Sequence, residues 1–144
     1  MEMAFPQYPL TIEQREGQSC VWDIIRKKWV VLQPEESVRQ ALLHYLIRDR
    51  NVSPGRVGVE REIRYNQMRR RFDLVVFDAQ GKPFILCECK APEVPVSQDT
   101  LHQIARYNAS IRAPHLLLTN GLSLLFFSQM EDGKYHFQPS GWYE

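Results

Sequence analysis

The chain has 144 residues, of which 44% are hydrophobic and 24% are charged, and its formal net charge is +1. This length and composition are typical of one globular domain with its own core, and they exclude a disordered chain. A net charge so close to zero excludes a protein that binds nucleic acid through bulk charge alone. No apolar run approaches the roughly 20 residues of a membrane helix, so no membrane contact is expected.

The N-terminus and the cysteines bear on the cellular compartment. The first six residues have no basic flank followed by an apolar stretch, so no secretory signal is expected. The three cysteines are odd in number, and Cys87 and Cys89 fall within one predicted strand, so a disulfide framework is not expected. We therefore expect a cytoplasmic protein.

Helix and strand signals alternate along the chain after an N-terminal segment. Residues 1–33 are predicted to form an irregular or strand-rich cap, packed on a main domain over 34–144, the two together making a single structural domain. A helix is predicted over 34–50, because apolar residues recur there at spacings of three and four after acidic residues that suit a helix N-terminus. The later predicted elements are strands over 57–65, 72–78 and 84–90, a helix over 98–111, strands over 115–119 and 122–128, and an edge strand over 135–138.

The turns between these elements support the same order. A hairpin-length turn with Gly81 separates the second and third strands, and Asn120-Gly121 is a strong hairpin signal between the two strands that follow the second helix. The order of helix, three strands, helix and two strands predicts an α/β fold with a central mixed β-sheet flanked by helices.

Charged side chains are concentrated where the second and third of these strands meet. Glu88 and Lys90 are two residues apart on one strand, so they share a face at a separation of about 6.6 Å. An adjacent antiparallel strand about 4.8 Å away would place Asp73 beside them. Two carboxylates suit Mg²⁺, and Lys90 could orient or deprotonate a water or stabilise charge on a phosphate. The alternative for a bare Glu-x-Lys pattern is a salt bridge at a strand end.

A wider set of motifs resembles the PD-(D/E)XK nuclease superfamily. Residues 72–78, the glycine turn and residues 85–92 resemble its catalytic hairpin, although Phe72 stands where the superfamily name has proline. The stretch over 34–40 resembles its first-helix glutamate motif, with Glu36 in the active-site position. More narrowly, the stretch over 34–128 is similar to the N-terminal nuclease domain of type I restriction enzyme R subunits.

The second helix carries a further motif of the same superfamily. Gln103 and Tyr107 match the Q-x-x-x-Y pattern of its exonuclease-like branch, and their spacing places both on one helix face. The resemblance implies that these two side chains support the site or contact the DNA backbone.

The resemblance implies a restriction-endonuclease-like core that hydrolyses DNA phosphodiester bonds with Mg²⁺, for which Mn²⁺ could substitute. Asp73 and Glu88 would hold the metal, with Glu36 helping directly or through a water, and Lys90 would assist the attacking water. The implied catalytic residues are Asp73, Glu88, Lys90, Glu36, Gln103 and Tyr107.

Arginines cluster just before the predicted catalytic hairpin. Five arginines against the single acid Glu62 give residues 61–71 a local charge excess of +4. Such a stripe can mark where a polyanion lies, and the alternative is a solvated strand pair or turn. The residues expected to contact DNA phosphates are Arg64, Arg69, Arg70, Arg71 and Arg106.

The expected partner is DNA, although these residues do not distinguish DNA from RNA. The sequence has no G-x-x-x-x-G-K-[S/T] loop, so we expect neither a nucleotide cofactor nor a translocase motor, and restriction activity itself is not carried over. The expectation is thus a stand-alone domain of this type, for which a homodimer remains open. The alternative is a non-catalytic DNA-binding or protein-interaction module that keeps the fold.

Overall fold

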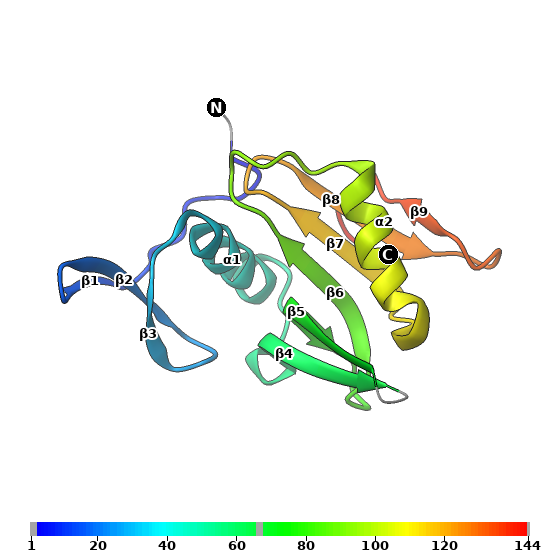
Figure 1. Ribbon diagram of the computed structural model, residues 1–144, viewed down its shortest axis with the longest axis horizontal. Helices are drawn as coiled ribbons and strands as arrows, with labels where there is room; N and C mark the ends of the chain where they lie inside the picture. Colours follow the sequence, from blue (N-terminus) through cyan, green and yellow to red (C-terminus); the bar gives the residue numbers. More distant parts are fainter. Residues whose placement is uncertain (1–2, 66–67, 144) are drawn as a thin grey trace.

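A six-stranded mixed sheet forms the centre of the computed structural model, which describes residues 3–65 and 68–143. The side chains of Arg64, Tyr65, Met68, Arg70 and Ser110 lie outside that description. The strand order in this sheet is β4-β5-β6-β7-β8-β9, and β1-β2-β3 form a separate three-stranded sheet beside α1 (Figure 1). The strands are β1 (Ile12–Arg15), β2 (Gln18–Asp23), β3 (Lys28–Val31), β4 (Val57–Tyr65), β5 (Met68–Phe77), β6 (Pro83–Cys89), β7 (His115–Thr119), β8 (Leu124–Gln129) and β9 (Tyr135–Phe137), and the α-helices are α1 (Pro34–His44) and α2 (Gln98–Ile111).

The pairing of β6 with β7 makes the central sheet mixed. These two strands are parallel, whereas the other neighbouring pairs of this sheet are antiparallel. Parallel neighbours need a crossover connection, which α2 supplies between β6 and β7. The prediction of an α/β fold with a mixed sheet flanked by helices is therefore confirmed.

The two helices cover opposite faces of the sheet (Figure 1). Alternate residues of a strand point to opposite faces, so each central strand contributes to two apolar clusters. Leu42 and Leu43 of α1 pack with one set of strand residues, and Ile104 of α2 packs with the other. Cys87 and Cys89 are buried on the α1 face, while Leu86 between them is buried on the α2 face.

The largest differences from the predicted bounds lie in β5 and α1, whereas β6, β8 and β9 differ by one or two residues at an end. The strand β5 begins at Met68 rather than at residue 72, because residues 68–71 pair with residues 62–65 of β4 in a long hairpin. The α1 helix ends at His44 and continues as a π-helical turn, Tyr45–Asp49, up to the predicted break. At the start of β5, arginines occupy positions where an apolar alternation would have revealed the strand, whereas the apolar spacing over 45–47 does not distinguish a π-helical turn from an α-helix.

The predicted hairpin between β7 and β8 is present but shorter in its second strand. The side-chain oxygen of Asn120 accepts hydrogen bonds from the backbone N–H groups of Leu122 and Ser123, at 3.0 and 2.9 Å. Because these residues belong to the turn, β8 begins at Leu124 rather than at residue 122.

Three strands occupy much of the predicted N-terminal cap. Trp22 of β2 and Trp29 of β3 face each other edge to face, with ring centroids 5.4 Å apart. The turn between these strands is directed toward α1, and Asp23, the last residue of β2 before it, is fully buried. Within residues 3–65 and 68–143, no helix has the length and apolar character needed to cross a membrane.

Candidate active site

The β5–β6 pairing brings the two predicted metal-binding carboxylates together. Leu74 pairs with Cys87, so the preceding residue, Asp73, lies beside Glu88 at the end of this ladder. The backbone N–H of Cys89 donates a hydrogen bond of 2.8 Å to Asp73 Oδ2. Asp73 is therefore fixed against the strand that carries Glu88.

The pKa of the Glu88 carboxyl group is shifted by burial and by the charged groups around it. Its burial, followed by the negative charge of Asp73, raises its pKa to about 8, while the Lys90 ammonium acts to lower it. The negative charge of Glu35 on α1 adds to the upward shift of this pKa. The predicted neighbours Asp73, Glu88 and Lys90 thus interact with one another in the folded protein.

Lys90 follows directly after β6 and is half-buried. Its backbone N–H donates to the carbonyl oxygen of Thr119 at 2.9 Å, which ties this end of β6 to β7. The side chain therefore extends from a fixed point of the backbone, beside Glu88.

Glu36 lies on α1, and its carboxylate is held by three donors. The Arg26 Nη2 atom donates to it at 3.1 Å, Arg39 Nη1 at 2.8 Å and Gln40 Nε2 at 3.2 Å. Arg39 also donates from Nη2 to Asp73 Oδ1 at 2.9 Å. Glu36 is thus joined to the Asp73 carboxylate through the guanidinium of Arg39.

Arg39 remains charged although its side chain is only 8% exposed. Burial acts to lower its pKa, but the hydrogen bond to Asp73 and the charges of Glu36, Asp73 and Glu60 outweigh burial and raise it. The guanidinium is therefore a permanent positive charge next to Asp73.

Gln103 and Tyr107 form a pair on α2. Gln103 Nε2 donates to the Tyr107 hydroxyl at 3.2 Å, as expected for residues four apart on one helix face. The α2 helix packs on the face of the sheet that includes Leu86. Strand alternation assigns Glu88, two residues beyond Leu86 on β6, to the same side as α2, while its charge interactions join it to Asp73, Lys90 and Glu35 of α1 at the end of the strand.

The arginines expected to bind DNA differ in their contacts and exposure. Arg69 of β5 forms an ion pair with Glu62 of β4 at 3.4 Å, and Arg71 is exposed. Arg106 is exposed on α2. The side chains of Arg64 and Arg70 lie outside the described residues.

The donor set at Asp73 and Glu88 fits a hard divalent cation such as Mg²⁺. The two carboxylates supply oxygen ligands, which Mg²⁺ prefers while it keeps several waters. Among the described residues, no group of three or more His, Cys, Asp and Glu side chains has a metal-binding arrangement. Burial raises the pKa of both the Cys87 and the Cys89 thiols, which keeps them protonated on the α1 face.

The local charge also favours a cation. The ion pairs and the charge interactions of Glu88 link six carboxyl groups to three cationic side chains, a formal excess of three negative charges when Glu88 is ionised and of two when it is protonated. A divalent ion would offset much of this excess. The carboxylates belong to Asp23, Glu35, Glu36, Glu60, Asp73 and Glu88, and the cations to Arg26, Arg39 and Lys90.

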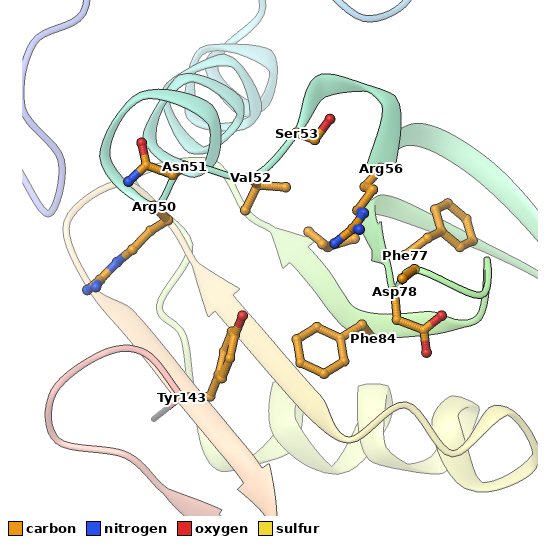
Figure 2. A pocket seen from close by; sticks show the side chains of 11 residues that line it. Arg50, Asn51, Val52, Ser53, Arg56, Phe77, Asp78, Phe84 and Tyr143 are labelled. Carbon is orange, nitrogen blue, oxygen red and sulfur yellow. The ribbon is translucent and has the colours of Figure 1, made fainter.

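A separate hollow of about 420 Å³ lies at the other end of β5 and β6. Figure 2 shows Phe84 and Tyr143 on one side of this hollow, with Arg56 extending toward it. Phe84 is four residues before Glu88, about 13 Å along the strand. Neither Asp73 nor Glu88 lines the hollow, so it is distinct from the carboxylate site.

The arginines that organise these carboxylates are not among the site residues that the sequence predicts. Arg39 and Gln40 follow Glu36 by three and four residues, so helical spacing could have placed them beside it. Arg26 and Glu60 are brought to the site by tertiary structure, and no local pattern indicates either of them.

The mixed sheet, the flanking helices and the carboxylates on β5 and β6 define a restriction-endonuclease-like α/β fold. The family described as "Type I restriction enzyme R protein N terminus" matches residues 34–140, and the chain belongs to this family. This membership confirms the resemblance found in the sequence and indicates a nuclease-related domain. No curated protein matches the chain.

Proposed function

We propose that the protein is a Mg²⁺-dependent nuclease that hydrolyses DNA phosphodiester bonds. The observation that carries this proposal is the convergence of Asp73 and Glu88, beside Lys90, at one end of the β5–β6 pair. The family membership supports it, because the R-subunit N-terminal family is nuclease-related. The proposal does not extend to restriction activity or to an ATP-driven motor.

Asp73 and Glu88 are the proposed metal ligands, and Glu36 contributes through a water or by holding Arg39. When bound, Mg²⁺ would polarise the scissile phosphate and lower the pKa of the attacking water. Glu88 must lose its proton before it can bind the ion, since its pKa is about 8. The charge excess of the surrounding carboxylates favours that ion over the proton.

Lys90 is the proposed partner of the attacking water. Its ammonium lies next to Glu88, where it can hold a water for attack or stabilise negative charge that develops on the phosphate. Its backbone is already held by the hydrogen bond to Thr119, so no main-chain ordering is needed to bring the side chain to the site.

The remaining predicted residues would hold the substrate. Gln103 and Tyr107 on α2 offer an amide and a hydroxyl to the DNA backbone on the side toward which Glu88 points. The exposed Arg71 and Arg106, with Arg69, are proposed to contact phosphates, which contribute affinity without base specificity.

One observation favours the non-catalytic alternative. The Glu36 carboxylate accepts hydrogen bonds from Arg26, Arg39 and Gln40, so its charge is already compensated within the protein. A module that binds DNA without cutting it would keep such a network as a purely structural one.

A cleavage assay separates the two functions. Linear, circular, single-stranded and branched DNA would be incubated with the protein and Mg²⁺, Mn²⁺ or EDTA. We expect cleavage that needs the metal and that falls about 100-fold or more in Lys90→Ala and Asp73→Asn. Lys82→Ala is the matched control, because Lys82 is an exposed lysine at the opposite end of the same hairpin.

Each outcome of this assay has a definite meaning. Cleavage that persists in both active-site variants would identify a contaminant. A folded wild type that binds DNA but cuts none of the substrates would support the non-catalytic module.

A further inference from the structure

The turn between β2 and β3 is built to present one arginine to α1. The backbone N–H groups of Ile25 and Arg26 both donate to Asp23 Oδ1, at 2.9 and 2.7 Å. Arg26 Nε donates to the other oxygen of the same carboxylate at 2.9 Å, and Gln40 Nε2 donates there as well at 2.8 Å. The buried Asp23 therefore fixes both the turn and the direction of the Arg26 side chain.

Arg26 uses its remaining nitrogens on two other carboxylates. Nη2 contacts both oxygens of Glu36, at 3.1 and 3.2 Å, and Nη1 contacts Glu60 Oε2 at 3.3 Å. The Arg26 side chain is only 14% exposed, so these contacts are largely shielded from water. The Arg26 guanidinium thus binds one carboxylate of the N-terminal sheet, one of α1 and one of β4.

Arg39 shares the same two carboxylates and extends the network to Asp73. Its Nη1 atom lies 2.8 Å from Glu36 and 3.3 Å from Glu60, and its Nη2 atom lies 2.9 Å from Asp73. Arg26 and Arg39 therefore both bind Glu36 and Glu60. The N-terminal sheet is connected in this way to a proposed metal ligand.

Glu60 adopts an unfavourable backbone conformation within this network. Its φ of 51° lies in the left-handed region although it belongs to strand β4, and a side chain in that region costs energy. Its carboxylate contacts both Arg26 and Arg39. The conformation that directs Glu60 toward both arginines is thus maintained in spite of its cost.

We propose that Arg26 and Arg39 are positioning residues for Asp73, so that the N-terminal sheet is an integral part of the active site. This inference rests on the proposed function. Arg26 precedes residues 34–140, which are the part of the chain that the family covers, so the family match does not include this half of the network. Arg39 orients Asp73, and Arg26 orients Arg39 through the carboxylates that they share.

Arginine is required in both places because of its shape. Each guanidinium spans several carboxylates with separate nitrogens, which the single ammonium of lysine cannot do. A lysine at either position keeps the positive charge near the site but loses the bridging geometry. Arg26→Lys and Arg39→Lys therefore separate a positioning role from a purely electrostatic one.

The test is Mn²⁺ binding to the full chain, measured by calorimetry well below the melting temperature of each variant. We expect Arg39→Lys to bind Mn²⁺ about 10-fold or more weakly than wild type, and Arg26→Lys to show a smaller loss in the same direction. Arg15→Gln is the control, because Arg15 belongs to the same N-terminal sheet but stacks on Trp29 and pairs with Glu13. Its affinity should equal that of wild type.

A second measurement uses the wild type and so does not depend on how the variants fold. Titration with Mg²⁺ should shift the side-chain Nε–Hε NMR signals of Arg39 and Arg26 but not that of Arg15. The Arg39 Nε atom is buried and has no hydrogen-bond partner within residues 3–65 and 68–143, so its signal should be distinct from those of exposed arginines.

The possible results separate this inference from the proposed function. A wild type that binds no divalent ion would refute the proposed function and the inference with it. A wild type that binds Mn²⁺, with both lysine variants binding as tightly or more tightly, would refute the positioning role alone. Mg²⁺ shifts absent from both arginine signals in a protein that binds the ion would refute it as well.

Discussion

The backbone N–H of Cys89 donates a 2.8 Å hydrogen bond to the Asp73 carboxylate, so Asp73 on β5 is tied to the strand that carries Glu88. Arg39 contacts the other oxygen of Asp73 at 2.9 Å. The carboxylate is thus held from two sides, by main chain and by a buried cation. Preorganisation of this kind is what a metal ligand requires.

The affinity for Mg²⁺ should depend on pH through Glu88. Below about pH 8 this carboxyl group is protonated, so binding the ion must release its proton. We expect the affinity to rise with pH, by up to about tenfold per unit, and to level off above the Glu88 pKa. Calorimetry in buffers of different ionisation enthalpy measures the proton release. A constant affinity between about pH 6 and 9 would contradict the assignment of Glu88 as a ligand.

Neutralising Glu88 should stabilise the metal-free protein. Its folded-state pKa of about 8 is above the ordinary value of 4.5, so the folded state holds this proton more tightly than the unfolded chain. The resulting stability is fully present below about pH 4.5 and is lost as the pH rises through about 8.

The Glu88→Gln side chain cannot ionise, so this variant does not lose stability at residue 88 as the pH rises. We expect its free energy of unfolding at pH 8 to exceed that of wild type by on the order of 1 kcal/mol, measured in urea with EDTA. Glu131→Gln, at an exposed glutamate, serves as the control. A Glu88→Gln protein less stable than wild type would show that ionisation of Glu88 does not destabilise the folded protein.

The basic surface of β5 should contribute to DNA affinity. Replacing Arg69 and Arg71 with alanine should weaken binding and reduce the slope of log K against log salt by about one for each lost phosphate contact. The double variant Lys28→Ala/Lys134→Ala removes the same charge from exposed positions outside β5. If both double variants weakened binding equally, net charge and not this surface would be responsible.

The end of α2 should depend on Asn108. This side chain is buried and forms two hydrogen bonds with the backbone of Ala113, one at 3.1 Å from Nδ2 to the carbonyl and one at 2.8 Å from the N–H to Oδ1. Asn108→Ala leaves the buried N–H of Ala113 without its acceptor, while the Ala113 carbonyl keeps the Tyr135 hydroxyl as donor at 2.6 Å. The free energy of unfolding should therefore fall by about 1–3 kcal/mol. His102→Ala, at an exposed position of the same helix, should change it little.

The sequence predicts the bounds of an element best where those bounds follow from the element's own residues and not from its neighbours in the fold. The α2 helix has the bounds that the sequence predicts, because a break with prolines precedes its apolar periodicity. The sequence does not predict the start of β5, because the arginines at its beginning hide the alternation of a strand and only the pairing with β4 reveals it.

The same contrast holds at the site. Strand alternation was enough to place Asp73, Glu88 and Lys90 together, since it depends only on residue spacing and on one neighbouring strand. Arg26 and Glu60 are 34 residues apart in the chain and meet only because the N-terminal sheet and β4 both approach α1. No short pattern in the sequence carries that information.

The proposal that Asp73 and Glu88 bind a divalent metal ion is tested most directly by a crystal structure with Mn²⁺, in which anomalous scattering locates the ion. We expect a peak bonded to carboxylate oxygens of both Asp73 and Glu88, and none at that position in Asp73→Asn crystals. A well-ordered site without a peak at millimolar Mn²⁺, or a peak bound only by other residues, would contradict the account.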